Sequence, residues 1–374
     1  MVASVFFTDS VTVAGLKQKY SDAILGRGKV RIVIVPGHDD ESWGTDNNGV
    51  KEADMTVVLG EELYKLLQDD PEYEPILVRD KSGYREPFKS FFVAEQASIK
   101  SFVANKKQIM RDLMAAGMVH RSDGVVHNNA PLPVVWRLYG INKWANENKA
   151  DIVIHIHFND YPGRRRSKTG QYAGFSIYVP EGQFSNARAS RAFATPLFEQ
   201  FSKFYPASNL PKEDDGIVSD QELIALGAYN TLDAASALIE YGYIYEQAFL
   251  DAEVRDTFLR ELALQTYIGI NRFFGNTREI FRRYPTSLLP FEWSSPLKEG
   301  DRSHPSILSL QAALLYENLY PPEGVDKHTC PLTGSFGPCT ALAVKGFQQK
   351  YGIIPPTGVV GEVTLGKLNE LYGR

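Results

Sequence analysis

Residues 29–38 read KVRIVIVPGH, and this stretch decides the fold. An apolar, β-branched run that ends in Pro-Gly is typical of a strand buried on both faces of a sheet. Comparable runs recur at residues 75–79, 151–157, 174–179 and 234–240, with helical patterns between them. This alternation predicts an α/β fold, with a mainly parallel, twisted sheet flanked by helices.

Polar side chains stand where these predicted strands end. His38 follows the first strand, His155 and His157 lie in the segment IHIHFN at residues 154–159, and Glu240 closes the run ALIE. Glu52 opens the helical pattern of residues 52–68. Ligands gather at the carboxyl ends of strands in open α/β sheets. Two imidazoles and a carboxylate suit a catalytic zinc ion that keeps a fourth position for water.

Ordinary structural roles compete with this interpretation. A histidine after Pro-Gly is also typical of a cap or core residue, and a carboxylate such as Glu52 is favourable at a helix N-terminus. His155 and His157 share one face of their strand, so both imidazoles are candidates for one metal. Glu240 ends an apolar strand, where an unpaired carboxylate is costly. Burial there would raise its pKa toward the range of a general base.

The chain divides into four parts in this interpretation. We expect an N-terminal extension at residues 1–28, a catalytic domain at 29–275, a Pro- and Ser-rich linker at 276–296 and a small three-helix domain at 297–374. Residues 81–135 form an insertion in the catalytic domain. It contains an amphipathic helix with Phe92, Ile99, Phe102, Ile109 and Leu113 on one side, and we expect it to act as a lid or an inhibitory element at the catalytic rim.

Charge and composition limit the partners. The 374 residues carry 40 basic and 45 acidic side chains, a net charge of −5, which gives no electrostatic footprint for nucleic acid. No apolar run is long enough for a membrane span. We expect a monomer. The run of residues 164–168, RRRSK, is either a solvated loop or a contact for carboxylates of a peptide or an anionic wall polymer.

Four ordered segments resemble the zinc-dependent N-acetylmuramoyl-L-alanine amidases, which hydrolyse bacterial peptidoglycan. They are PGH at 36–38, GVKE at 49–52, HIHFN at 155–159 and EYGY at 240–243. Arg137 and Asn142 match an Arg and an Asn that this family shows before the third strand. The resemblance covers roughly residues 29–275.

Carried over residue by residue, the resemblance implies zinc on His38, Glu52 and His157, with Glu240 as the catalytic carboxylate. His157 holds the position of the family's His-x-Asn, and Asn159 is the Asn of that motif. His155 replaces the usual Ser, so it remains a candidate for orienting a ligand, contacting substrate or replacing His157. Arg137 is a further candidate for substrate contact. The long insertion and Asp39-Asp40, in place of glycines, leave the substrate preference open.

The tail resembles the peptidoglycan-binding domain that is often appended to such enzymes. The matching segments are LSLQAAL at 308–314, GSFGPCT at 334–340, FQQKYG at 347–352 and TGVVG at 357–361. The alternative is a helical domain that only stabilises the protein. The resemblance implies peptidoglycan as the partner, both its glycan strand and its stem peptide.

The expected function is hydrolysis of the amide between N-acetylmuramic acid and the L-alanine of the stem peptide, by zinc-activated water with a Glu base. A zinc-dependent wall carboxypeptidase or endopeptidase and a non-catalytic wall-binding protein are the alternatives. We expect the cell envelope or the extracellular space, where Cys330 and Cys339 would form a disulfide. Two free thiols would instead fit a phage lysin made in the cytoplasm.

Overall fold

A six-stranded sheet forms the centre of the computed structural model, which describes residues 9–125, 127, 130–161, 163–165, 168–276 and 284–373. The strand order is β4-β1-β7-β10-β8-β9. Only the β8–β10 pair is antiparallel within this sheet, so the prediction of a mainly parallel sheet is confirmed. The strands are β1 (Val30–Pro36), β4 (Tyr73–Leu77), β7 (Ile152–Asn159), β8 (Ser176–Pro180), β9 (Ile217–Asp220) and β10 (Ala235–Tyr243).

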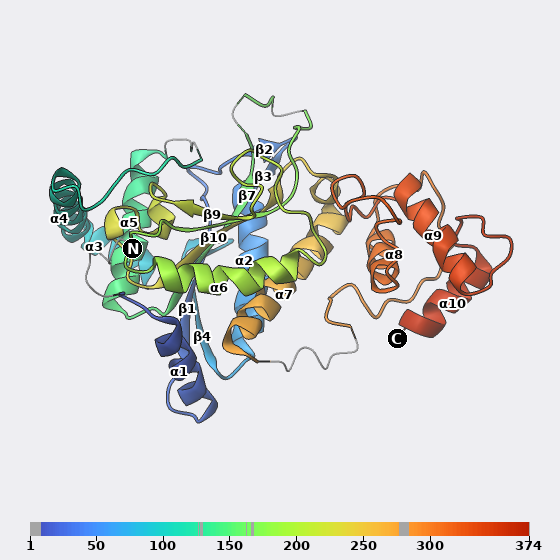
Figure 1. Ribbon diagram of the computed structural model, residues 1–374, viewed down its shortest axis with the longest axis horizontal. Coiled ribbons are helices and arrows are strands. Elements are labelled where there is room, and N and C mark those ends of the chain that lie inside the picture. The colour runs from blue at the N-terminus through green and yellow to red at the C-terminus, as the bar shows by residue number, and fades with distance from the viewer. Residues whose placement is uncertain are drawn as a thin grey trace.

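Helices cover both faces of the sheet (Figure 1). One face packs against α2 (Glu52–Gln68), α6 (Ala187–Phe201) and α7 (Ala252–Phe274). The opposite face carries Val33, Val35 and Val153, which form one apolar cluster with Trp144 of α5 (Leu132–Glu147). Two short ribbons, β2–β3 (Asp46–Asn47, Val50–Lys51) and β5–β6 (Arg79–Asp80, Gly83–Tyr84), lie beside the sheet, and α1 (Val13–Ile24) contacts β1 and α6.

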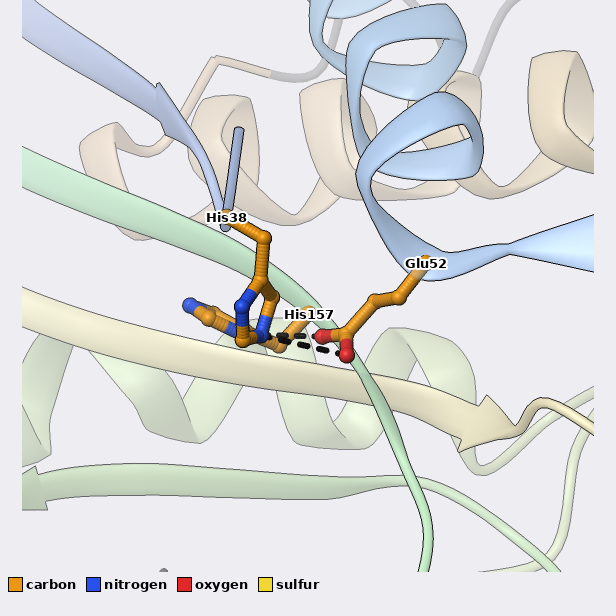
Figure 2. A group of neighbouring side chains, drawn as sticks. All are labelled: His38, Glu52 and His157. Atoms are coloured by element: carbon orange, nitrogen blue, oxygen red, sulfur yellow. Dashed lines mark hydrogen bonds and ion pairs between the residues drawn. The ribbon is translucent and has the colours of Figure 1, made fainter. Parts of the chain in front are cut away.

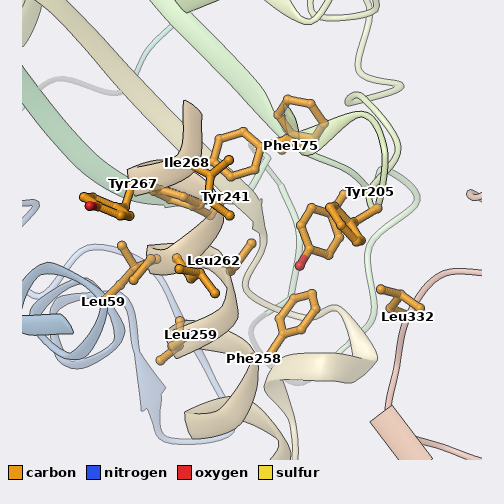
Figure 3. Close-up of a cluster of buried hydrophobic side chains, with 14 of the residues drawn as sticks. Leu59, Phe175, Tyr205, Tyr241, Phe258, Leu259, Leu262, Tyr267, Ile268 and Leu332 are labelled. Atoms are coloured by element: carbon orange, nitrogen blue, oxygen red, sulfur yellow. The ribbon is translucent and has the colours of Figure 1, made fainter. Parts of the chain in front are cut away.

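The largest apolar cluster runs through α7 and reaches the tail of the chain. Leu259, Leu262 and Ile268 of α7 are buried in it (Figure 3). Leu332 of the tail lies in the same cluster near Phe258. The catalytic part and the tail therefore share one continuous core instead of being joined only by a free tether. The 3₁₀ turn η3 (Gln247–Phe249) precedes α7, which ends at Gly275 in the left-handed conformation.

The insertion at residues 81–135 differs from the single amphipathic helix that we predicted. It contains two helices, α3 (Phe88–Ala94) and α4 (Gln96–Ala115), which break at Glu95. Four of the five predicted side chains lie in or against apolar clusters, namely Phe92, Ile99, Phe102 and Leu113. Ile109 is the exception at 47% exposed, and α4 also buries Val103 and Met110. The predicted apolar side is therefore right except at Ile109, and the break separates only Phe92 from the rest.

The tail folds into three helices, as expected: α8 (Pro305–Tyr316), α9 (Pro338–Lys350) and α10 (Glu362–Tyr372). A disulfide joins Cys330 to Cys339 just before and at the start of α9. The described part of the expected linker, residues 284–296, is packed against protein, with Leu288, Leu289 and Trp293 buried. Among the described helices, none is long and apolar enough to cross a membrane.

Candidate metal centre

Two neighbouring strands and one helix start bring the predicted ligands together. Strands β1 and β7 are parallel partners, with Pro36 opposite Ile156, so their carboxyl ends meet at one edge of the sheet. His38 follows β1 by two residues, and His157 lies near the end of β7. Glu52 is the first residue of α2, directly after the β2–β3 ribbon. The fold thus brings together three candidate ligands that lie up to roughly a hundred residues apart in the sequence.

The three side chains converge on Glu52 (Figure 2). The Oε2 atom of Glu52 lies 3.1 Å from Nε2 of His38, and its Oε1 atom lies 3.0 Å from Nδ1 of His157. One ligand atom from each residue lies within 4.8 Å of the other two. Two imidazole nitrogens and one carboxylate oxygen at such separations form a donor set that fits a metal ion.

Glycines make room for this cluster. A Cβ atom on Gly37 would lie 2.3 Å from Cε1 of the His157 ring, so only glycine allows the ring to approach. A Cβ atom on Gly44 would lie 2.3 Å from Oε2 of Glu52. His38 itself adopts a positive φ of 63°, which is unusual for a residue with a side chain and is typical of functional positions.

Hydrogen bonds keep Glu52 ionised although its side chain is buried. Burial alone would raise its pKa, but His38 and His157 hold that pKa far below its usual range. The backbone N–H groups of Thr45 and Phe158 also donate to Glu52, at 3.0 and 3.1 Å. Burial lowers the pKa of His157, which favours the neutral imidazole that binds metals.

Glu240 lies in the same cavity as the cluster. The cavity has a volume of about 890 Å³ and is lined by His38, Glu52, His157 and Glu240, among others. Glu240 stands opposite His157 in the β7–β10 register. Its Oε2 atom is inaccessible and has no hydrogen-bond partner within the described chain. Burial, together with the charges of Glu52 and Glu213, raises the pKa of Glu240 well above its usual value.

His155 lies deeper on the same face and is not part of the three-residue cluster. It is fully buried between Val35 and Leu238, its partners on β1 and β10. Neither ring nitrogen has a partner in the described part of the chain. Burial lowers its pKa to about 3, so the ring is neutral. His155 is also among the residues that line the cavity.

The other predicted site residues line the cavity with partners of their own. Arg137 forms ion pairs with Asp39 and Glu41. The Nδ2 group of Asn159 donates to Glu213 at 3.1 Å. Glu213, which is 1% exposed, also lines the cavity. We did not predict Glu213, because it lies in a loop before β9 and no local spacing marks it.

The basic run at residues 164–168 is only partly a solvated loop. The side chain of Arg164 is 1% exposed, and its Nε group pairs with Asp160 at 2.6 Å. Arg164 lines the cavity, and its guanidinium lies over the ring of Tyr245. Residues 166 and 167 lie outside the described residues.

The sequence matches the family model for N-acetylmuramoyl-L-alanine amidases over residues 32–272. The chain belongs to this amidase family. A second model, for a putative peptidoglycan-binding domain, matches residues 303–368. The chain is therefore an N-acetylmuramoyl-L-alanine amidase with a C-terminal peptidoglycan-binding domain, and the His38–Glu52–His157 cluster fits the metal site of such an enzyme.

Solved structures of amidases match this chain at low sequence identity. The catalytic domain of CwlV from Bacillus (Paenibacillus) polymyxa var. colistinus is 16% identical, with a TM-score of 0.41, over 66% of this chain and 98% of that chain. Ami1 from Mycobacterium smegmatis is 14% identical, with a TM-score of 0.42, over 66% and 97%. The CwlD amidase from Clostridioides difficile, in complex with the GerS lipoprotein, is 17% identical, with a TM-score of 0.39, over 66% and 99%. No curated protein sequence matches this chain.

Proposed function

We propose that this amidase uses a zinc ion held by His38, Glu52 and His157, and that Glu240 is its general base. The observation that carries the proposal is the unpartnered Oε2 atom of Glu240, in the same cavity as a cluster of two imidazoles and a carboxylate. Zinc at such a site supplies Lewis acidity and lowers the pKa of a bound water toward 7.

Glu240 has the environment of a base whose proton affinity is raised. Its buried carboxylate gains most by accepting a proton, because no described group donates to Oε2 and two other carboxylates lie near it. Glu240 would accept the proton of the attacking water and then deliver it to the nitrogen of L-alanine as the amide bond breaks. The lactyl carboxylate and a stem peptide with a free N-terminus are the products.

Neighbouring residues would hold the substrate in place. The neutral ring of His155 lines the cavity and has no partner for either nitrogen among the described residues, which would suit a hydrogen bond to the substrate near the scissile amide. Arg137 is already paired with Asp39 and Glu41, so it would order the loop after β1 and present its remaining N–H groups to the substrate. Asn159, held by Glu213, would act as a fixed donor or acceptor.

The insertion at residues 81–135 would border the substrate. Tyr84, Val125 and Pro131 all line the cavity, which is consistent with a lid or an inhibitory element at its rim. Deletion of the insertion should change activity on whole sacculi more than it changes the stability of the fold. Equal activity on sacculi and on a soluble muramyl peptide after deletion would contradict the role.

We also propose that the protein works outside the cytoplasmic membrane as a monomer. The Cys330–Cys339 disulfide and the location of peptidoglycan support an oxidising compartment. Intact-mass measurement of the protein from its native source, before and after reduction, tests the disulfide in solution. Two free thiols there would instead support a lysin made in the cytoplasm.

Substitution of Glu240 tests the mechanism. Glu240→Ala should lower turnover of purified sacculi by about 10²–10⁴-fold while zinc content stays at one ion per chain, because a general base is needed for chemistry and not for ligation. Products of the unaltered enzyme should be intact stem peptides with N-terminal L-alanine. Loss of zinc in Glu240→Ala would make Glu240 a ligand, and products cleaved within the stem would make the enzyme a peptidase.

A further inference from the structure

A strap of chain, residues 119–125, connects α4 toward α5 and crosses beside strands β8 and β9. Two glutamine side chains from outside the insertion fix it. Gln183 accepts from the backbone N–H of His120 at 2.8 Å and donates to its carbonyl oxygen at 3.0 Å. Gln221 donates to the same carbonyl at 2.8 Å and accepts from the N–H of Ser122 at 3.2 Å. The strap is therefore an ordered wall of the cavity.

The strap leads to His127, which is held by a buried carboxylate. The Nε2 atom of His127 lies 2.7 Å from Oδ2 of Asp220, whose residue is 2% exposed. The Oδ1 atom of Asp220 accepts from the N–H groups of Glu222 and Leu223, each at 2.8 Å. Burial opposes ionisation of Asp220, but His127 and these two N–H donors lower its pKa. An ionised Asp220 can only accept, so Nε2 of His127 carries the proton of this bond.

The other ring nitrogen of His127 remains available. Nδ1 has no hydrogen-bond partner among the residues that the structure describes, and the side chain is 27% exposed. His127 lines the same cavity as the metal cluster, with its ring 5.5 Å from that of Tyr178. In the tautomer that donates from Nε2 to Asp220, Nδ1 is an acceptor of fixed orientation. The carboxylate–histidine pair thus presents one aimed acceptor to whatever occupies the cavity.

The strand order separates the part of the cavity beside His127 from the strand of His157. Tyr178 of β8 stands opposite Leu238 of β10, and β10 separates β8 from β7, which carries His157. Two strand spacings of about 4.8 Å put this position about 10 Å from the strand of His157. An extended peptide covers this distance in about three residues.

The stem peptide is the branch of the substrate that suits this part of the cavity. A glycan strand continues in both directions and needs an open surface, whereas a stem peptide branches away from it. The strap walls this part of the cavity, where Val125 packs against the cluster of Tyr178 and Leu238. A stem peptide, which branches from the glycan, fits against such a wall, whereas the continuous glycan strand fits the open side of the cavity.

The charge of this region selects the group that binds. Glu222 is exposed and lines the cavity next to the carboxylate–histidine pair. An aimed nitrogen acceptor beside a carboxylate suits an ammonium group. We propose that His127, oriented by Asp220, binds the side-chain amine of the third residue of the stem peptide. This assignment rests on the proposed amidase function, because it takes the stem peptide as the ligand.

Calorimetric titration of the full chain with free stem peptides tests the assignment. The probes are L-Ala–γ-D-Glu–L-Lys, the same tripeptide acetylated on its lysine amine, and the dipeptide L-Ala–γ-D-Glu. The unaltered chain should bind the free tripeptide about tenfold more tightly than the acetylated one, as expected for one charge-assisted hydrogen bond. His127→Ala should remove that difference and leave binding of the dipeptide unchanged. On a muramyl tripeptide it should raise KM about tenfold, with kcat within about twofold.

His120→Ala is the matched control, because this exposed histidine lies in the same strap and anchors it through backbone atoms only. It should bind all three probes as the unaltered chain does. Equal affinity of the unaltered chain for the free and acetylated tripeptides would overturn the assignment without any variant. An unaltered chain that discriminates the probes but does not hydrolyse muramyl peptides would contradict the proposed mechanism and leave the binding role of His127 in place. Hydrolysis of muramyl peptides by a chain that does not discriminate the probes would support the mechanism and overturn the His127 assignment.

Discussion

Buried glutamine side chains of the peptidoglycan-binding domain are hydrogen-bonded, whereas some buried polar groups of the catalytic cavity have no partner among the described residues. In the binding domain, Gln311 is 0% exposed and its amide is saturated. Its Oε1 atom accepts from the N–H groups of Thr333 and Gly334, at 2.9 and 3.0 Å, and its Nε2 group donates to Ser335 and Thr340. Each partner comes from the loop or helix that follows α8.

Gln348 repeats this arrangement one helix later. It accepts from the N–H of Gly358 at 2.9 Å and donates to Val359 and Thr364, which lie in the next loop and in α10. In the cavity, by contrast, both nitrogens of His155 and the Oε2 atom of Glu240 are buried without described partners. Saturated groups fix the fold, whereas unsaturated ones are costly and are tolerated where a ligand is to be bound.

The largest effect that we predict separates the two cavity histidines. His157→Ala should weaken metal binding by more than about 100-fold, because even partners that only orient a ligand are worth 10–100-fold. His155→Leu should keep its metal. Elemental analysis of the dialysed proteins measures both. Equal metal content in His157→Ala and the unaltered chain, with loss in His155→Leu, would move the ligand role to His155.

The second prediction removes a saturated group. Gln311→Ala should lower the free energy of unfolding of the binding domain by about 2–4 kcal/mol, because it leaves two backbone N–H groups and a Thr hydroxyl without their buried partner. Gln349→Ala, at an exposed position of α9, should change it by less than about 0.5 kcal/mol. Urea unfolding followed by fluorescence measures both. A similar small loss in the two variants would break the comparison.

The third prediction replaces an unsaturated group. His155→Leu should leave the free energy of unfolding unchanged or raise it by up to about 1 kcal/mol, although His155 is as buried as Gln311, because no described hydrogen bond is lost and an unpaired polar group is removed. The same urea experiment compares the two sites directly. A loss above about 2 kcal/mol would show that His155 has a structural partner in solution.

The smallest predicted effect concerns Asp70, which does not line the cavity. The pKa of this carboxylate is raised although it has hydrogen-bond partners. Burial and the neighbouring Glu72 raise the pKa of Asp70 to about 6, although Tyr267 donates to it at 2.7 Å. The folded state therefore holds this proton more tightly than the unfolded chain, whose Asp pKa is about 4. Stability from this group is present below pH 4 and is lost as pH rises through 6.

Asp70→Asn should remove the loss of stability that accompanies deprotonation of Asp70. Relative to the unaltered chain, the variant should gain about 1 kcal/mol between pH 4 and pH 8, a value reduced for solvent screening. Urea unfolding at the two pH values measures it. A difference that stays constant with pH would mean that Asp70 titrates normally in the folded protein.

The sequence predicted the elements that carry the site better than it predicted the insertion. The strands at His38, His157 and Glu240 are mostly apolar runs, because nearly all of their side chains are buried. The break at Glu95 between α3 and α4 was not predicted, because it leaves no clear mark in the composition. Strand β8 was found, but its antiparallel direction depends on pairing and not on local pattern.

The amino-acid sequence by itself determined the α/β class and the family, and it marked the candidate ligands, because strand ends, Pro-Gly turns and short motifs are local properties of the chain. Only the tertiary structure decided which side chains have partners. The Oε2 atom of Glu240 lacks a partner among the described residues, Glu213 has several partners, and His127 is hydrogen-bonded to Asp220. The physical reason is that hydrogen bonding and desolvation depend on residues distant in sequence, which only the folded chain brings within 3 Å of one another.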